Sequence, residues 1–219
     1  MVVREKFEGE LQELKVNVIK MSDMAVVVLE IAYDALLEKD IDLALTVLDE
    51  DKKLDKLEED VEEAAILMIA KQQPVASDLR HIISAIKISS EIERVGDYAK
   101  NIAKTAIRLA KEERPFENAA VAEMHEIGLK MMAMFKEAYV EENLTMAKEL
   151  AELDDRMDEL YGQVIKSILN ASPKGNDTRN QNSQLLFLVR HYERAGDHIT
   201  NLAEDILYMA KGRRYHLND

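Results

Sequence analysis

The sequence predicts an all-α protein made of two tandem, repeat-related three-helix bundles, with six long helices packed in a coiled-coil-like way. Three observations lead to this prediction. The composition has 11 Met but only 7 Gly, 3 Pro and no Trp, which is typical of long helices. Apolar residues recur at alternating spacings of three and four, which is the spacing of a helix packed lengthwise against its neighbours. The second half of the chain also repeats the plan of the first.

The first half contains three predicted helices. The first covers roughly residues 4–38, the second ends before Pro74, and the third lies between Pro74 and Pro115. The apolar stripe of the first helix is Phe7, Leu11, Leu14, Val18, Met21, Ala25, Val28, Ala32 and Ala35. The stripe of the second is Leu54, Leu57, Val61, Ala64 and Met68, and that of the third is Ile88, Ile92, Val95, Ala99, Ile102 and Ala106.

The second half follows the same plan. Val121, Met124, Met131 and Ala138 mark a fourth helix, and Leu153, Met157, Leu160 and Val164 mark a fifth. Residues 172–177 are rich in turn formers, and Asp177 or Thr178 is a candidate N-cap for a sixth helix that ends near Gly212. We therefore place the two repeats at residues 1–114 and 115–219.

The clearest sign of duplication lies in the third and sixth helices. Residues 93–103 are ERVGDYAKNIA and residues 193–203 are ERAGDHITNLA, so six of eleven positions are identical at an offset of 100. Upstream the offset is 103, because Asp51, Leu54 and Asp55 of the first half align with Asp154, Met157 and Asp158 of the second. Identity at a fixed offset indicates an internal repeat.

Charge and composition exclude several classes of function. The formal charge of −14 opposes binding to the phosphate backbone of nucleic acids. The chain has no cysteine, so it has neither disulfides nor thiolate metal ligands. We find no signal peptide and no apolar run of 18 residues, and we expect a cytoplasmic protein without a membrane span.

The repeated motif places oxygen ligands in a line. Glu93, Asp97 and Asn101 are four residues apart and therefore share one side of the third helix. The repeat-related line on the sixth helix is Glu193, Asp197 and Asn201. The line lies away from the apolar stripe, so it should face outward or into a groove. Two carboxylates and an amide suit a hard or borderline cation such as Mg, Ca, Mn, Fe or Zn.

A solvated acidic surface is the alternative. With 43 acidic residues, a pair of acids four apart is expected about eight times by chance, so only the repetition gives these residues weight. One helix also supplies too few ligands for a full coordination shell. Four further acids are repeat-related, but they point away from the apolar stripe of their helices and we expect them to be solvated. These acids are Asp51, Asp55, Asp154 and Asp158.

Glycine and arginine complete the repeated motif. Gly96 and Gly196 each cost their helix about 1 kcal/mol relative to alanine, so their repetition predicts close approach by another backbone, with drift from a common ancestor as the alternative. We expect Arg94 and Arg194 to pair with an acid on another helix rather than to bind phosphate.

Catalytic signatures are missing from the sequence. We find no glycine-rich phosphate loop and no nucleophile elbow. No histidine follows a glutamate at a spacing of three, so the Glu-x-x-His pairs of ferritin-like di-iron bundles are absent. We assign no catalytic residue, and the only cofactor that we expect is a metal ion.

The quoted motifs resemble those of the PhoU family of bacterial phosphate-uptake regulators, over essentially the full chain. The supporting segments are QPVASDLR at residues 73–80, EIERVGD at residues 91–97 and ERAGDH at residues 193–198. Glu91 stands where the family commonly has Asp, and we expect this difference to change little because the position lies outside the Glu-x-x-x-Asp pair.

The resemblance implies a function that the residues alone do not. It implies a non-enzymatic negative regulator of the phosphate-starvation response, which contacts the ATPase of the phosphate ABC transporter and a membrane sensor histidine kinase. It also implies metal at the Glu-x-x-x-Asp motifs, with Fe, Zn, Mg or Mn as candidates, and an outward acidic groove is compatible with a homodimer. The alternatives are a metal-dependent enzyme or metal store using clustered carboxylates, and a purely structural helical bundle.

Overall fold

The computed structural model describes residues 2–112, 118–170 and 176–217, and within these residues the chain forms six α-helices and no strand. The first bundle contains α1 (Val2–Glu38), α2 (Ile41–Gln72) and α3 (Ala76–Leu109), and the second contains α4 (Ala119–Glu141), α5 (Leu144–Asn170) and α6 (Asn176–Lys211). The all-α class and the six helices are therefore confirmed. The boundary at residues 114 and 115 and the 172–175 part of the turn-rich segment lie outside the described residues, as do the side chains of Asp177 and Thr178.

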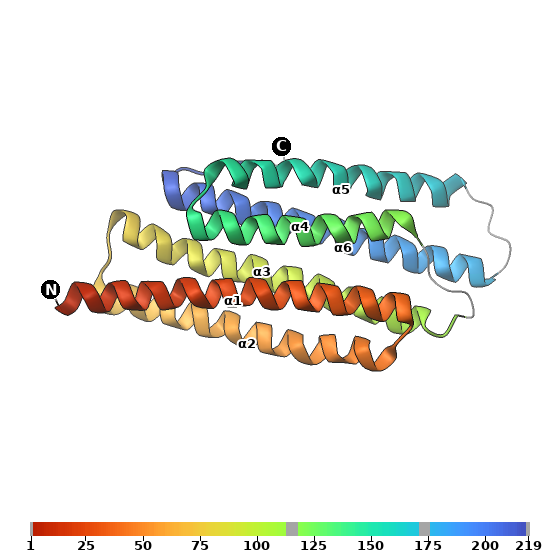
Figure 1. Cartoon of the computed structure of the whole chain (residues 1–219), viewed down its shortest axis with the longest axis horizontal. Coiled ribbons are helices and arrows are strands. Elements are labelled where there is room, and N and C mark those ends of the chain that lie inside the picture. The colour runs from red at the N-terminus through yellow and green to blue at the C-terminus, as the bar shows by residue number, and fades with distance from the viewer. Residues whose placement is uncertain (1, 113–117, 171–175, 218–219) are drawn as a thin grey trace.

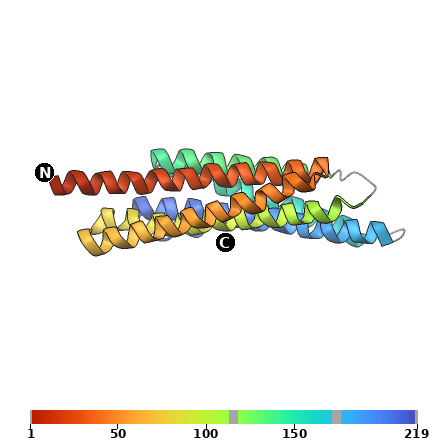
Figure 2. The same ribbon diagram turned by 90° about the horizontal axis from the view of Figure 1, so that it is seen from below.

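The two bundles lie side by side and form an elongated molecule (Figure 1). Figure 2 shows the same rods from a perpendicular direction, with all helices running roughly along the long axis. The bundles meet chiefly along α3 and α6, with a smaller contact between α1 and α4. The α2 and α5 helices lie on opposite outer edges (Figure 1). The repeated motif is thus on the two central helices, each of which also packs against an outer helix of its own bundle.

The tight turns inside each bundle are also repeat-related. Lys39 and Glu142 both adopt the left-handed conformation that ends a helix, with φ of 56° and 52°. The next residue caps the following helix: Asp40 accepts a hydrogen bond from the amide of Leu43, and Asn143 accepts from the amide of Met146. These two-residue connections make α1 and α2, and α4 and α5, antiparallel neighbours.

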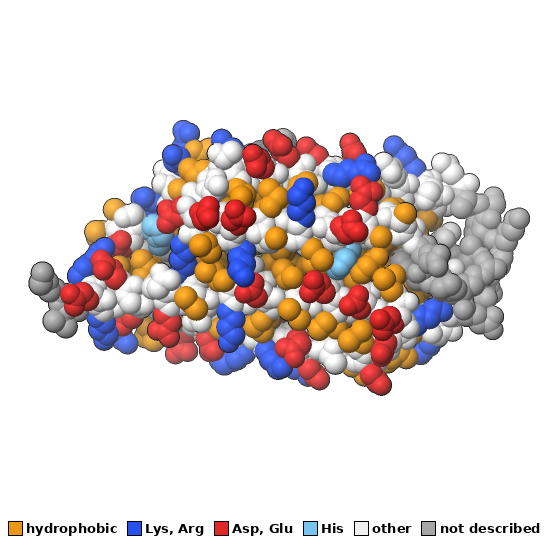
Figure 3. All heavy atoms as spheres, in the orientation of Figure 1, with side chains coloured by type: hydrophobic (Ala, Val, Ile, Leu, Met, Phe, Trp, Pro, Cys, Tyr) orange, Lys and Arg blue, Asp and Glu red, His pale blue; other side chains and the backbone are white. Residues whose placement is uncertain are grey.

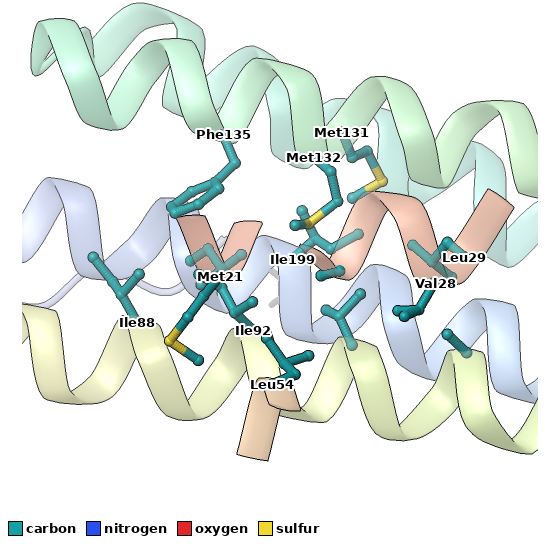
Figure 4. Close-up of a cluster of buried hydrophobic side chains, with 14 of the residues drawn as sticks. Met21, Val28, Leu29, Leu54, Ile88, Ile92, Met131, Met132, Phe135 and Ile199 are labelled. Atoms are coloured by element: carbon teal, nitrogen blue, oxygen red, sulfur yellow. The ribbon is translucent and has the colours of Figure 1, made fainter. Parts of the chain in front are cut away.

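Most residues of the apolar stripes identified in the sequence lie in the core, together with residues of α6 such as Leu188 and Leu202. Four stripe residues are only partly buried: Leu11, Leu57, Ala64 and Leu153. Figure 4 shows side chains from both bundles converging, among them Met21, Ile92, Phe135 and Ile199, and all four are 0% exposed. Met131 and Met157 are also fully buried, which confirms the methionines as core-filling residues. Burial of these stripes on the facing sides of long helices supplies the main drive for folding.

The surface is mixed in character. Figure 3 shows acidic and basic side chains intermixed with apolar ones on one face of the molecule. Within the described ranges, no helix is long and apolar enough to cross a membrane.

Candidate functional site

Each bundle has a cluster of four acidic side chains where its outer helix packs against its central helix. The first acidic cluster contains Asp51 and Asp55 of α2 with Glu93 and Asp97 of α3. The second acidic cluster contains Asp154 and Asp158 of α5 with Glu193 and Asp197 of α6. Glu93 and Asp97 have side chains that are 19% and 27% exposed, so the predicted ligand line is half-buried at a helix contact.

Two of the acids that we expected to be solvated are buried. Asp51 is 3% exposed and Asp154 is 6% exposed, so the expectation is wrong for both. Asp55 is half-buried with one buried oxygen, and Asp158 is exposed as predicted. The helical wheel placed these residues away from the apolar stripe of their own helix. In a three-helix bundle, however, the outer helix contacts two neighbours, and Asp51 and Asp154 lie on the side that meets the central helix.

The repeated glycines make room for these aspartates. A Cβ atom at Gly196 would lie 2.5 Å from Asp154 Oδ1, and one at Gly96 would overlap the Leu54 side chain and lie 3.8 Å from Asp51 Oδ1. The close approach predicted from the sequence is present, but the approaching atoms belong to side chains of the outer helix rather than to its backbone. A buried carboxylate beside a glycine is therefore common to both repeats.

A lysine pairs with two carboxylates of the first acidic cluster. The Lys100 ammonium lies 2.5 Å from Asp51 Oδ2 and 2.6 Å from Asp97 Oδ1, and it donates a hydrogen bond to Asp51. Burial acts to raise the pKa of Asp97, but the hydrogen bond and charge of Lys100 outweigh it, and the pKa lies below its usual range. Burial and the nearby Asp97 charge raise the pKa of Glu93 to about 7.

The second acidic cluster has a threonine at the repeat-related position. Thr200 donates a hydrogen bond of 3.1 Å to Asp154 Oδ2, but a hydroxyl carries no charge. Asp154 Oδ1 and Glu193 Oε2 are buried and have no hydrogen-bond partner in the structure. Burial, then the charge of Asp197, raises the pKa of Asp154 to about 7, and the same two causes raise the pKa of Glu193.

The arginines of the motif pair locally, contrary to our expectation of an acid on another helix. Arg94 lies 3.0 Å from Asp97, and Arg194 lies 2.7 Å from Asp197, in both cases three residues along the same helix. Both guanidinium groups are partly exposed, so each pair is worth about 1 kcal/mol or less. The arginines thus screen the outer side of each cluster.

The Asn residues of the predicted line differ in their surroundings. Asn101 is half-buried on α3, one turn beyond Asp97. The Asn201 amide donates a hydrogen bond of 3.1 Å to Glu91 Oε2 of the other repeat. Asn201 therefore lies at the contact between the repeats, and its side chain does more than extend the line of oxygen ligands beside Asp197.

Glu91 joins the two repeats, which the sequence did not predict. Its carboxylate lies 2.6 Å from His198 Nδ1 and also accepts the bond from Asn201, so it links α3 to α6. A second link joins Lys87 of α3 to Asp205 of α6 at 3.3 Å. The side chain at position 91 therefore matters for joining the repeats, although it lies outside the Glu-x-x-x-Asp pair. Sequence spacing gave no sign of these contacts, because the partners of Glu91 lie on a different helix that is far away in the sequence.

The two clusters differ in how well they suit a metal ion. In the described parts of the chain, no group of three or more His, Asp or Glu side chains is arranged to hold a metal as it stands, so ligands would have to turn toward an ion. The first cluster already has an ammonium between two of its carboxylates. Each cluster has two buried oxygens without a hydrogen-bond partner, on Asp51 and Asp55 in the first and on Asp154 and Glu193 in the second, and such oxygens can be satisfied by a cation. Only the second cluster lacks an ammonium between its carboxylates in the described residues.

Comparison with known proteins places this architecture in a family. The model of the PhoU domain matches the chain twice, at residues 18–106 and 121–206. The chain belongs to the PhoU family. Its two PhoU domains correspond to the two three-helix bundles, and each match contains one copy of the Glu-Arg-x-Gly-Asp motif. This confirms the resemblance seen in the sequence.

Individual PhoU proteins match over nearly the whole chain. The chain is 36% identical to a protein of Clostridium acetobutylicum over 100% of both chains, and 38% identical to one of Aquifex aeolicus over 94% of both. Both relatives are named phosphate-specific transport system accessory protein PhoU homolog. Among solved structures, PhoU of Streptococcus pneumoniae superposes with a TM-score of 0.89 at 26% identity, covering 96% of this chain and 99% of the other.

Proposed function

We propose that this chain is a non-enzymatic accessory protein of phosphate transport that represses the phosphate-starvation response when phosphate is plentiful. The observation that supports this most directly is full-length similarity, at 36% identity, to a protein named for that transport system. The structural relative from Streptococcus pneumoniae is likewise named a phosphate transport system regulatory protein.

The proposed mode of action is that of an adaptor. The chain contacts the ATPase of the phosphate ABC transporter on one side and a membrane sensor histidine kinase on the other, as the family resemblance implies. A long, rod-like pair of bundles offers separate surfaces for two partners (Figure 1). We include a homodimer and a cytoplasmic location in the proposal, and light scattering of the purified chain checks the first of these.

Metal binding at the acidic clusters is the second part of the proposal. Its support is the pair of buried oxygens, on Asp154 and Glu193, that lack a partner in the second cluster. A bound cation would satisfy these oxygens and offset the repulsion among the surrounding carboxylates. The ion would hold the surrounding carboxylates in a fixed arrangement, or form part of a surface that a partner protein contacts.

The regulatory part is tested by complementation. A reporter driven by a phosphate-starvation promoter should be active at high phosphate in a deletion strain, and the intact chain should restore repression. Affinity capture at high and low phosphate should recover both the transporter ATPase and the sensor kinase. Capture of neither partner, together with unaltered reporter activity in the deletion strain, would reject the adaptor.

The metal part has its own test. The Asp97→Asn/Asp197→Asn double variant should lose the metal that is found by elemental analysis in the unaltered chain purified without chelators. If repression persists in the double variant, metal binding and regulation are separate properties. Turnover or stoichiometric oxidation by the metal-loaded chain would instead favour an enzyme or a metal store.

A further inference from the structure

The two acidic clusters share their acids but differ in their cations. Each has two aspartates from the outer helix, a Glu and an Asp from the central helix, and one arginine that pairs with that Asp. Within the described residues, only the first cluster has a second cation in an ion pair with its acids, because position 100 is lysine and the repeat-related position 200 is threonine. Four acids thus have two ion-paired cations in the first cluster and one in the second, where the charge of Arg190 also acts on Glu193 but forms no ion pair with it.

Lys100 occupies the place that a bound cation would take. Its ammonium lies 2.5 Å and 2.6 Å from carboxylate oxygens of Asp51 and Asp97, which come from two different helices. Its side chain is 22% exposed, while that of Asp51 is 4% exposed, so the ammonium reaches inward to a buried carboxylate. A metal ion at the same carboxylates would have to displace this ammonium or bind beside it against charge repulsion.

The second cluster has the same arrangement without the internal cation. Asp154 is 6% exposed, and one of its oxygens, which lies against Gly196, has no hydrogen-bond partner. Glu193 also has a buried oxygen without a partner. The first cluster has two such oxygens as well, on Asp51 and Asp55, so the clusters differ in the lysine ammonium and not in the number of unpartnered oxygens. The repeat-related pair in the first cluster shows that a cation can be held between the outer-helix and central-helix aspartates in this fold. In the second cluster no side chain of the described ranges supplies that cation, so the place is open to an ion from solution.

We propose that metal binding in this chain is asymmetric: the second acidic cluster, at Asp154, Glu193 and Asp197, takes a divalent cation, whereas Lys100 substitutes for the metal in the first. This inference rests on the metal-binding part of the proposed function and restricts it to one repeat. It assigns Lys100 as an internal counter-cation and position 200 as the residue that leaves the second cluster free for an ion.

Two matched pairs of variants test the asymmetry, with Mn²⁺ as the probe and the free-ion electron paramagnetic resonance signal as the measure of binding. The first pair removes one carboxylate charge from each repeat. Asp197→Asn should abolish tight Mn²⁺ binding, and Asp97→Asn should leave the number of bound ions and their affinity unchanged.

The second pair exchanges the residue that differs between the repeats. Lys100→Thr should raise the number of Mn²⁺ ions bound per chain, and Thr200→Lys should weaken binding by about tenfold or more. Lys104→Thr, one turn further along α3, is the matched control for loss of a lysine and should bind as the unaltered chain does. Circular dichroism at equal concentration checks that each variant retains its helices.

The outcomes separate the inference from the proposal on which it rests. Equal loss of Mn²⁺ binding in Asp97→Asn and Asp197→Asn would show that both clusters bind metal and would overturn the asymmetry alone. Unchanged stoichiometry in a folded Lys100→Thr would overturn the assignment of Lys100 as the residue that substitutes for the metal. Absence of Mn²⁺ binding in all of these proteins, Lys100→Thr included, would overturn metal binding itself along with the asymmetry. Loss of tight Mn²⁺ binding in Asp197→Asn but not in Asp97→Asn, with more Mn²⁺ ions bound by Lys100→Thr, supports the inference.

Discussion

Replacing Gly196 by alanine tests whether the repeated glycine exists to admit a buried carboxylate. The new Cβ would lie 2.5 Å from Asp154 Oδ1 and 3.4 Å from Met157 Cγ. Asp154 cannot swing away without cost, because its other oxygen accepts a hydrogen bond from Thr200. A real Cβ requires one of these groups to move.

The expected free energy follows from three contributions. Alanine stabilises a helix interior by about 1 kcal/mol relative to glycine. Against this, losing the Thr200 hydrogen bond costs about 1 kcal/mol, and overpacking a close contact costs about 1–3 kcal/mol. Gly196→Ala should therefore reduce the free energy of unfolding by about 1–3 kcal/mol. For a chain of this size each kcal/mol corresponds to about 2–4 °C in Tm.

Gly162→Ala is the matched control. It lies inside α5, and a Cβ there would have nothing within 4 Å, so the change should stabilise the chain by about 0.5–1 kcal/mol. Thermal unfolding with chelator present, followed by circular dichroism, should give opposite signs for the two variants. An equal rise in Tm for both would refute the reasoning, because it would show that Asp154 moves freely and that the glycine is not required.

Three further predictions concern the charges. Burial is the main cause that raises the pKa of Asp154 to about 7, so the folded chain holds more protons than the unfolded chain between about pH 4 and 7. The free energy of unfolding of the metal-free chain should therefore fall as the pH rises through this range. Asp154→Asn should flatten this pH dependence, measured by urea unfolding. Lys100→Met should cost about 2–4 kcal/mol because it leaves the buried Asp51 unpaired, and a double-mutant cycle with Asp51→Asn should recover part of that loss. Glu91→Gln removes a charge-assisted hydrogen bond to His198 and should lower the free energy of unfolding by about 1–2 kcal/mol. Amide exchange should speed up more in α6, which loses this contact, than in α5.

The fold was accessible from the sequence because long helices leave a strong periodic signal. The predicted first helix, at residues 4–38, is within two residues of the observed α1. Pro74 lies in the connection between α2 and α3, as its effect on backbone geometry requires. The duplicated turns at Lys39 and Glu142 were less visible, because each uses a left-handed residue other than glycine.

The candidate site was only partly predictable. Glu93 and Asp97 share one face of α3 because helical spacing alone fixes that relation. The burial of Asp51 depends on how α2 is rotated against α3, and a single-helix wheel contains no such information. Glu91 illustrates the same limit, since its partners His198 and Asn201 are more than 100 positions away.

The difference between Lys100 and Thr200 is visible in the aligned repeats, yet it gains meaning only from the packing. Identical positions were informative because repetition exceeds chance, and a position that differs between the copies carried no such signal. The contact between α2 and α3 shows that position 100 faces the buried Asp51 from a neighbouring helix. A duplicated site that keeps its acids but changes its counter-charge presents a different electrostatic environment to a cation in each copy. If the proposed asymmetry holds, divergence at this one position changes metal binding, whereas divergence on the exposed surface does not.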